Sequence, residues 1–438
     1  MALLSPCIAG IMERSEGMKY AIIGFGTAGY HAVEAIRSYD KTGEIDVYCD
    51  TGLPPYNPML TTYYVSEKLA RDGLFPFGSL DELGARLGFR YRREAVKHMN
   101  AKARSVETER GAERYDRILI ATGATAFAPA VKGLAPEDAF LMRTVADAER
   151  LKARLARGDV RSAVVVGASM AGIKVVEALS KYDVKICLAD LAPHIFPLAA
   201  YPETASIIEE RVAKRGVGLR FGVSIDHMEI RGGRRTAVMT DGAELDADIV
   251  ALCIGTRAAT SVAEGEVEIG RGIAVNRRME TSAPGIYAAG DCCEGINLES
   301  GQPQIIGLWA NANHQGRVAG TNMAGHDAEF EGNILHNITH FMDMDFIGFG
   351  DNRIRGEVLE TGPRENGLYL RMVLKDGVIA GANILDNHQI SGIIKNDMLR
   401  LFSGDKSPIP DYQRATLIRA GIPEAFLERM EALTHGYA

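Results

Sequence analysis

Two glycine-rich turns occur at corresponding points of the chain. The first reads Gly-Phe-Gly-Thr-Ala-Gly over residues 24–29, and the second reads Gly-Ala-Ser-Met-Ala-Gly over residues 167–172. In such a turn the first glycine permits a tight bend, the second lets the backbone approach a pyrophosphate, and the third lets a helix pack closely on a strand. A carboxylate follows each turn, Asp50 after the first and Asp190 after the second, at a spacing suited to binding ribose hydroxyls. The pattern predicts two dinucleotide sites.

The segments around the two turns also repeat. An apolar, β-prone run enters each turn, KYAIIG in the first copy and SAVVVG in the second, and a helical pattern leaves it. Further along, DRILIATG over residues 116–123 parallels DIVALCIG over residues 248–255. Alternating strands and helices are typical of a parallel sheet with helices on both faces. The sequence therefore predicts an α/β fold with two Rossmann-like dinucleotide-binding domains.

The second turn departs from the glycine pattern at its middle position. Ser169 stands there, and it is small enough for close approach and can add a hydroxyl donor to a phosphate. Asp190 would repel a 2′-phosphate, and the following residues 191–200 contain no Arg or Lys to bind one. This favours NADH over NADPH. The alternative is that Asp190 merely ends a strand in solvent.

The composition of the 438 residues limits the classes of protein. Hydrophobic residues make up 46% and charged residues 24%, and the formal net charge is −8, which argues against nucleic acid as the main partner. The longest apolar stretches fall short of the roughly 18 residues that a membrane helix needs. Residues 1–17 lack the basic start of a signal peptide, so we expect an N-terminal extension and a cytoplasmic protein.

The cysteines and histidines give little support to a metal site. The six cysteines include no Cys-x-x-Cys pair. His336 and His340 lie four apart, a spacing that suits a metal on a helix, but no acidic or cysteine partner accompanies them. We therefore interpret them as surface or packing residues and predict no metal.

Taken in order, these motifs resemble those of the two-dinucleotide flavoproteins, the pyridine nucleotide–disulfide oxidoreductase superfamily. The resemblance covers residues 18–325 and implies that the first turn binds FAD and the second NAD(P)H. The Ala-Thr-Gly at residues 121–123 looks like the family's strand end beside the flavin. The Gly-Ile-Tyr-Ala-Ala-Gly-Asp at residues 285–291 looks like its last FAD motif, in which Asp291 would bind the ribityl chain. Val96 lies where the family's backbone contacts adenine.

The motifs and the resemblance together predict a set of cofactor-binding residues. These are Gly24, Gly26, Thr27, Ala28, Gly29, Asp50, Val96, Ala121, Thr122, Gly123, Gly167, Ser169, Met170, Gly172, Asp190, Gly255, Gly290 and Asp291.

The chain lacks the redox cysteines of several branches of this superfamily. Disulfide reductases carry a Cys-x4-Cys pair on the first FAD helix, and residues 29–38 contain none. NADH peroxidases, water-forming NADH oxidases and coenzyme A disulfide reductases carry one cysteine in the region equivalent to residues 53–64, which also contains none. Without a thiolate, attack on a disulfide or peroxide is not available. Cys292 and Cys293 remain an alternative redox pair, although the family often has a packing cysteine there.

The remaining relatives are ferredoxin and rubredoxin reductases and similar electron-transfer flavoproteins. Residues 308–316, LWANANHQG, resemble the Trp-x-Asn-Ala-x-x-Gln-Gly stretch of dioxygenase ferredoxin reductases. Trp309, the only tryptophan, would then lie near the flavin and nicotinamide on the path to an acceptor, and it is the candidate catalytic residue. The alternative is a helix-start tryptophan buried in the core. Two departures are the missing Arg and Lys around residues 58–62, and Lys174, where many relatives have a Glu that orients the nicotinamide.

The resulting prediction is an FAD-dependent NADH:acceptor oxidoreductase. It would pass electrons from NADH through the flavin to a carrier such as an iron–sulfur ferredoxin or a rubredoxin, and we expect a homodimer. The alternatives are an NADH oxidase, a flavin-dependent reductase of a small substrate, or a redox sensor that binds FAD and NADH without rapid turnover.

We also expect a particular division of the chain into domains. The predicted ranges are 18–130 and 259–330 for the FAD-binding domain, 131–258 for the NAD-binding domain, and 331–438 for an α+β C-terminal interface domain. In the last of these the sequence predicts a hairpin turn at Asp376-Gly377 and helices over residues 390–402 and 423–433.

Overall fold

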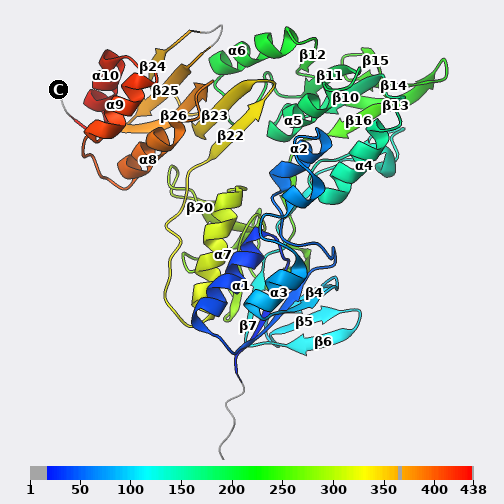
Figure 1. The fold of residues 1–438 in the computed structure, drawn as a ribbon, viewed down its shortest axis with the longest axis vertical. Helices are drawn as coiled ribbons and strands as arrows, with labels where there is room; N and C mark the ends of the chain where they lie inside the picture. The colour runs from blue at the N-terminus through cyan, green and yellow to red at the C-terminus, as the bar shows by residue number, and fades with distance from the viewer. Residues whose placement is uncertain (1–16, 364–366, 437–438) are drawn as a thin grey trace, which may run out of the picture.

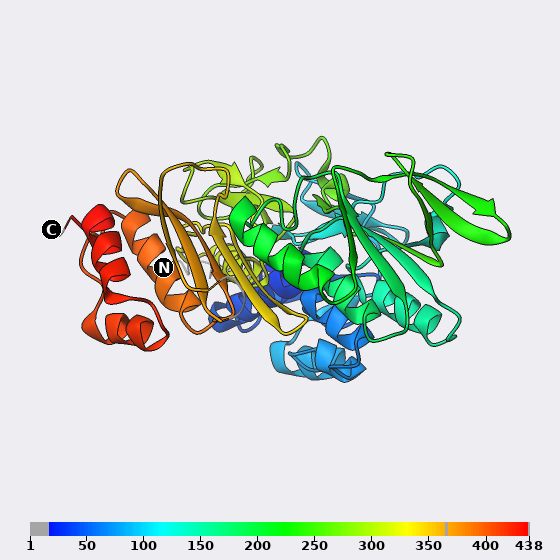
Figure 2. The same cartoon turned by 90° about the horizontal axis from the view of Figure 1, so that it is seen from above.

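The structure is a computed structural model that describes residues 17–363 and 367–436. Apart from Gly17, the expected N-terminal extension lies outside the described residues. Figure 1 shows a lower body that contains α1 and α7, and two upper bodies, one around α5 and one ending in α10. Seen from above in Figure 2, the orange and red C-terminal elements lie at one end and the green strands at the other. The predicted α/β fold class is confirmed.

The lower body is built on a five-stranded parallel sheet in the order β19-β7-β1-β2-β3. Every neighbouring pair in it is parallel, as the repeated β-α-β pattern predicts. Its strands are β1 (Lys19–Ile23), β2 (Glu44–Tyr48), β3 (Arg90–Arg92), β7 (Arg117–Ile120) and β19 (Ile286–Ala288). Two helices, α1 (Thr27–Tyr39) and α3 (Leu80–Leu87), come from the connections between these strands.

A third helix, α7 (Trp309–Met323), packs along α1 although it lies far away in the sequence (Figure 1). The close approach depends on Gly316, because a Cβ there would lie 2.2 Å from the carbonyl oxygen of Ala28. Larger side chains would force the helices apart. The packing brings the N-termini of α1 and α7 to the same side of the sheet.

The second body repeats the design with a parallel sheet in the order β12-β11-β10-β16-β9. The strands are β9 (Ala139–Phe140), β10 (Ser162–Val166), β11 (Lys185–Asp190), β12 (Gly218–Phe221) and β16 (Ile249–Leu252). The helices are α4 (Val145–Leu155), α5 (Met170–Leu179) and α6 (Pro202–Ala213). Antiparallel pairing of β8 (Ala124–Ala126) with β17 (Thr256–Ala258) joins the first body to the second.

One short helix from the first body's sequence packs on the second body. Helix α2 (Thr61–Val65) belongs to the connection between β2 and β3, yet it contacts α4 and α5 (Figure 1). Val65 is fully buried in the same apolar cluster as Val165 of β10. The connection also contains two short 3-10 helices, η1 (Pro58–Leu60) and η2 (Arg71–Leu74).

The C-terminal body is an antiparallel sheet in the order β22-β23-β26-β25-β24, with three helices. Its elements are β22 (His336–Phe341), β23 (Met344–Gly350), β24 (Glu357–Thr361), β25 (Tyr369–Lys375), β26 (Val378–Leu385), α8 (Ser391–Phe402), α9 (Asp411–Arg419) and α10 (Glu424–Thr434). The predicted turn at Asp376-Gly377 is present, with φ of 52° and 75°. Helix α9 was not expected. His336 and His340 lie on strand β22, where residues four apart are much more widely spaced than on a helix.

Smaller antiparallel sheets complete the structure. They are formed by β4 (His98–Asn100), β5 (Ser105–Thr108) and β6 (Gly111–Arg114), by β13 (Ile225–Arg231), β14 (Arg234–Met239) and β15 (Glu244–Asp246), and by β20 (Cys293–Ile296) with β21 (Pro303–Gln304), while β18 (Ile273–Ala274) pairs parallel with β20. No described helix is both long and apolar enough to cross a bilayer.

Candidate functional site

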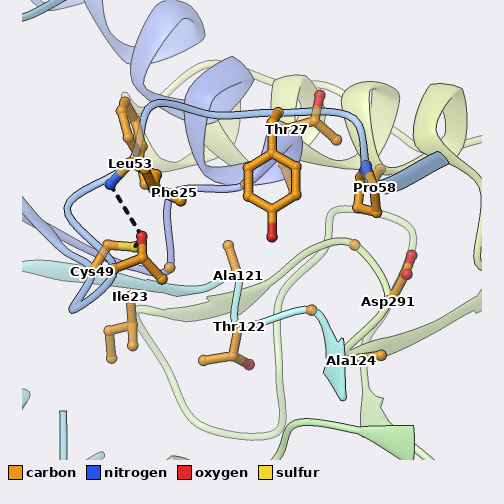
Figure 3. Close-up of a pocket in the computed structure, with 18 of the residues that line it drawn as sticks. Ile23, Phe25, Thr27, Cys49, Leu53, Pro58, Ala121, Thr122, Ala124 and Asp291 are labelled. Atoms are coloured by element: carbon orange, nitrogen blue, oxygen red, sulfur yellow. Dashed lines mark hydrogen bonds between the residues drawn. The ribbon is translucent and has the colours of Figure 1, made fainter. Parts of the chain in front are cut away.

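A cavity of about 430 Å³ lies at the carboxyl ends of the strands of the first sheet. This is the edge at which open α/β sheets bind ligands. Figure 3 shows Ala121 and Thr122 on one wall, the loop carrying Leu53 and Pro58 across from them, and Asp291 at one end. The residues of the predicted set that line this cavity are Gly24, Gly26, Thr27, Ala28, Asp50, Val96, Ala121, Thr122, Gly123, Gly290 and Asp291, together with Trp309.

The first glycine-rich turn gives each of its glycines a different environment. Gly24 has φ of +98°, and a Cβ there would lie 2.3 Å from the carbonyl oxygen of Ala121. A Cβ at Gly29 would lie 2.2 Å from the carbonyl oxygen of Gly24, so this glycine serves helix packing and does not line the cavity. A Cβ at Gly26 would meet no heavy atom within 4 Å. Gly26 therefore leaves an open space beside the backbone, as a turn that admits a pyrophosphate requires.

The N-terminal ends of two helices face this cavity. Thr27 and Ala28 of α1 line it, and so do Trp309 and Ala312 of α7. Neither helix has an acidic residue in its first turn. The Thr27 hydroxyl donates to the Asn313 side-chain oxygen, which ties the two ends together. Unpaired backbone N–H groups and the helix dipoles make such a place favourable for phosphate.

Asp291 is held by an arginine from the second body. Its carboxylate pairs with the Arg143 guanidinium at 2.7 Å, and Arg143 also donates to the carbonyl oxygen of Ala124. The backbone N–H of Gly290 donates to Oε1 of Gln315 on α7 at 2.9 Å, which fixes the loop that carries Asp291. Arg143 lines the cavity, and the sequence analysis missed it.

A sequence signal close to Arg143 does exist. Thr144 and Asp147 form a capping box, which marks residue 145 as a helix start and places Arg143 just before it. That signal fixes the local structure, but it carries no information about Asp291, which lies 148 residues further along the chain.

The adjacent cysteines after Asp291 are buried and face acceptor oxygens. The Cys292 thiol lies 3.3 Å from the carbonyl oxygens of Ile120 and Ala289. The Cys293 thiol lies 3.4 Å from the carbonyl oxygen of Gly290. The contact with Cys292 and burial raise the pKa of Cys293 well above its usual range. Thiols in such surroundings act as weak donors and packing groups.

Residues 53–59 of the connection after β2 cover the cavity with side chains that carry no thiol. Leu53, Tyr56 and Pro58 line it, and the Leu53 N–H donates to the Thr51 hydroxyl at 3.2 Å (Figure 3). Cys49, at the end of β2, is a lining residue that the sequence analysis missed. Figure 3 places Cys49 beside Leu53 and away from Asp291.

Trp309 begins α7 and is one of the residues that line the cavity. Its indole Nε1 is buried and has no hydrogen-bond partner among the residues that the structure describes. The open space at Gly26 and the two helix N-termini together fit FAD as the occupant of the cavity.

The second glycine-rich turn lies at the carboxyl end of the second sheet. A Cβ at Gly172 would lie 1.8 Å from the carbonyl oxygen of Gly167, so the two turns share the same close packing of helix on strand. The Ser169 hydroxyl donates to the carbonyl oxygen of Cys253 at 2.9 Å. The Ser169 proton that was expected to reach a phosphate is therefore taken by the backbone just after β16 in this structure. Met170 begins α5, and Gly255 follows β16.

Asp190 ends β11 beside this turn, as the sequence predicts. Its Oδ2 accepts from the Ala168 N–H at 2.6 Å and its Oδ1 from the Ala192 N–H at 2.8 Å. A carboxylate has about four acceptor positions, so two remain for ribose hydroxyls. Arg220 lies on the neighbouring strand β12, and its guanidinium pairs with the Asp241 carboxylate. Its positive charge is therefore already balanced and is not free for a 2′-phosphate.

Lys174 does not project toward a nucleotide. It is buried, pairs with Glu177 of the same helix, and donates to the carbonyl oxygen of His340 at 2.7 Å. Glu177 in turn pairs with Lys68 at 2.8 Å and accepts from the Met342 N–H. The lysine that departs from the family pattern therefore joins the second body to strand β22, and Glu177 joins it to the turn that follows this strand. Among the described residues, no group of three or more His, Cys, Asp or Glu could hold a metal ion.

Comparisons with known proteins agree with this geometry. The family model described as pyridine nucleotide-disulphide oxidoreductase matches residues 18–316. The chain is 28% identical over 398 residues to the NADH-dependent phenylglyoxylate dehydrogenase subunit epsilon of Aromatoleum evansii, covering 89% of this chain and 93% of the relative. It is 28% identical over 351 residues to an NADH oxidase of Methanocaldococcus jannaschii, covering 76% of each.

A solved structure shows the same fold. The crystal structure of the covalent putidaredoxin reductase–putidaredoxin complex has a TM-score of 0.82 at 20% identity, covering 96% of this chain and 99% of that one. The family model spans both glycine-rich turns and the segment that carries Asp291. The chain therefore belongs to the pyridine nucleotide-disulphide oxidoreductase family, as an FAD-dependent oxidoreductase that uses NADH.

Proposed function

We propose that this oxidoreductase passes electrons from NADH to a protein electron carrier of the iron–sulfur or rubredoxin type. The observation that carries the proposal is Trp309, which lines the cavity and whose ring contacts a second aromatic ring, Phe77, that is not part of the cavity wall. An aromatic contact that leads out of the cavity favours an acceptor outside it. A small substrate would instead have to enter the cavity.

The cysteines support an acceptor that needs no thiol relay. Residues 53–64 contain no cysteine, and Cys292 and Cys293 are buried against carbonyl oxygens. Cys49 lies at the end of the cavity that we assign to the adenosine ribose, beside Asp50. None of these thiols combines exposure with a position suited to attack on a substrate at the Asp291 end.

The protein's own residues bind, orient and shield the two cofactors. Gly26 and the N-terminus of α1 would hold the pyrophosphate of FAD, Asp50 the adenosine ribose, and Asp291 the ribityl chain, while the N-terminus of α7 would face the flavin. Arg143 holds the Asp291 carboxylate in position and offsets its charge. When bound, FAD supplies the exchange between two-electron hydride chemistry and one-electron transfer. The second turn, with Asp190, would orient NADH.

A relative supports the presence of a protein partner. The protein from Aromatoleum evansii is named as subunit epsilon of a dehydrogenase, so it works within an assembly of subunits. We infer that this chain likewise exchanges electrons with another protein. The homodimer, the cytoplasmic location and the domain boundaries given above stay predictions.

The test compares acceptors at fixed NADH concentration. We expect reduction of cytochrome c through an added [2Fe–2S] ferredoxin or a rubredoxin to exceed the rate with oxygen alone by at least about tenfold, or about 1.4 kcal/mol in activation free energy. A rate of NADH oxidation with oxygen alone that equals the rate with the carriers, with one O2 consumed for each NADH (hydrogen peroxide formed) or for every two NADH (water formed), would instead support the NADH oxidase alternative. FAD and NADH binding without turnover on any acceptor, ferricyanide included, would support a redox sensor.

A further inference from the structure

Three aromatic rings form a continuous stack that begins at the cavity. Trp309 lies nearly parallel to Phe77, with ring centroids 5.8 Å apart and 13° between the planes. Phe77 lies nearly parallel to Tyr30 of α1, with centroids 4.1 Å apart and 22° between the planes. Of the three, only Trp309 lines the cavity. This aromatic stack therefore leads from the cofactor cavity toward the surface formed by α1 and α3.

The outer end of the aromatic stack meets charged groups at the surface. The Tyr30 hydroxyl donates to the Glu34 carboxylate at 2.9 Å and accepts from the Arg86 guanidinium at 2.9 Å. Glu34 and Arg86 are about 36% and 52% exposed. Both line a hollow between α1 and α3, two helices that lie side by side in Figure 1. We call it the α1–α3 hollow.

The α1–α3 hollow carries more positive than negative charge. Arg37, Lys41 and Arg86 line it, against one acidic residue, Glu34. The Arg37 guanidinium donates to four backbone carbonyl oxygens, which fix it in place without removing its charge. Asp40 lies beside Arg37 and offsets part of this charge. In a chain with a net charge of −8, the hollow is a local site that attracts an acidic surface.

We propose that the α1–α3 hollow is the docking site for an acidic iron–sulfur carrier protein and that the aromatic stack is the path by which electrons reach it. The inference rests on the proposed function and deepens it, because it names the acceptor's surface and route. For each NADH that becomes NAD⁺, two oxidised carriers each gain one electron and one proton is released. The rings are the medium through which the electrons pass, and they are neither oxidised nor reduced.

The docking part is tested by binding, without a measurement of turnover. The FAD-loaded enzyme is titrated calorimetrically with oxidised plant-type [2Fe–2S] ferredoxin at low salt. Arg86→Glu should raise the Kd by about tenfold, because it reverses a charge in the hollow. The control is Arg234→Glu, an equally drastic change at a side chain that is 76% exposed on β14, and it should change the Kd by less than about twofold.

Cross-linking locates the same surface. A carbodiimide joins lysine amines to carrier carboxylates that lie in contact, and Lys41 is an exposed lysine of the hollow. Lys41→Gln should remove the main cross-linked product between enzyme and ferredoxin. A product that survives this change, together with a Kd that Arg86→Glu leaves unaltered, would overturn the docking site.

The electron path is tested by substitutions in its middle ring. Phe77→Leu keeps an apolar side chain but removes the ring, whereas Phe77→Tyr keeps the ring. We expect Phe77→Leu to lower the ratio of the ferredoxin rate to the ferricyanide rate by at least about tenfold. Phe77→Tyr should keep this ratio close to that of the unaltered enzyme. The control is Phe402→Leu, the same change at a half-buried ring of α8. An unchanged ratio in Phe77→Leu would overturn the path.

The outcomes separate this inference from the proposed function. If the unaltered enzyme oxidises NADH with ferricyanide but reduces neither ferredoxin nor rubredoxin, the proposed function fails. If it reduces ferredoxin, and the variants in the hollow and the stack behave like their controls, the proposed function stands and only this route is wrong.

Discussion

Replacing Gly26 by alanine should separate the stability of the protein from its affinity for FAD. Gly26 has φ of −76° and ψ of −168°, an extended conformation that any residue adopts, and a Cβ there would meet no heavy atom within 4 Å. A Gly→Ala change at a compatible position alters stability by about 0.4–1 kcal/mol. We therefore expect the FAD-free variant to unfold within about 1 kcal/mol of the original protein.

FAD binding should respond differently to the same methyl group. It occupies the space that the turn leaves for the pyrophosphate, and overpacking of this kind costs about 1–3 kcal/mol. The expected loss of FAD affinity is therefore about 5- to 150-fold. The assay removes FAD, measures urea unfolding of the FAD-free protein by circular dichroism, and then titrates FAD back while following its fluorescence.

Gly29→Ala is the matched control, because the same methyl group there would lie 2.2 Å from the carbonyl oxygen of Gly24. It should destabilise the FAD-free protein by about 1–3 kcal/mol. Normal FAD affinity in Gly26→Ala would refute the assignment of this turn to the pyrophosphate. A loss of more than about 2 kcal/mol in its FAD-free stability would show that the space beside Gly26 is not open.

Three further predictions concern the second nucleotide, the cysteines and pH. The unaltered enzyme should prefer NADH to NADPH by at least about tenfold in kcat/KM. Asp190→Ala should lower this preference, because the carboxylate that repels a 2′-phosphate is lost. A higher kcat/KM with NADPH in the unaltered enzyme would contradict the assignment of Asp190 to the ribose. Cys292→Ala and Cys293→Ala, singly and together, should keep the NADH:ferricyanide rate within about tenfold of the unaltered rate when FAD content is matched, because neither thiol is placed to react. A loss of rate above about a hundredfold would identify the two cysteines as a redox pair. Burial lowers the pKa of His336 from 6.5 to about 4, so the unfolded chain binds a proton at a pH where the folded protein does not. Stability should therefore fall as the pH drops from about 6.5 to 4, and His336→Asn should remove about 3 kcal/mol of that fall in unfolding measured at each pH. An unaltered pH dependence would contradict the burial effect.

Much of the fold could be predicted from the sequence, because its signals are local. The two β-α-β units follow from apolar runs that end in glycine and lead into helical patterns, and the structure shows parallel sheets at both places. The turn at Asp376-Gly377 and helix α8 follow from a turn dipeptide and a helical spacing. In each case neighbouring residues specify the backbone, so the pattern can be interpreted without knowing what lies opposite.

The sequence also identified part of the cavity lining, including the first glycine-rich turn, the Ala-Thr-Gly strand end and Asp291. Each glycine of the first turn has an environment that matches its expected part, a tight bend with positive φ at Gly24, open space at Gly26 and close packing at Gly29. The second turn shows the limit of this reasoning, because residue type alone did not reveal that the Ser169 hydroxyl donates to the carbonyl oxygen of Cys253, 84 residues away in the chain. A hydroxyl has several partners within reach, and only the folded backbone determines which one it takes.

The tertiary structure alone decided which distant residues meet. Arg143 reaches Asp291 across 148 residues, Lys174 turns away from the nucleotide to contact the carbonyl oxygen of His340, and Phe77 lies between Trp309 and Tyr30. These contacts leave no periodic signal in the chain, since each joins positions whose separation depends on how whole helices and sheets pack. Local conformation is set by neighbours in sequence, whereas the side chains that face one another across a cavity are set by the packing of the elements that carry them.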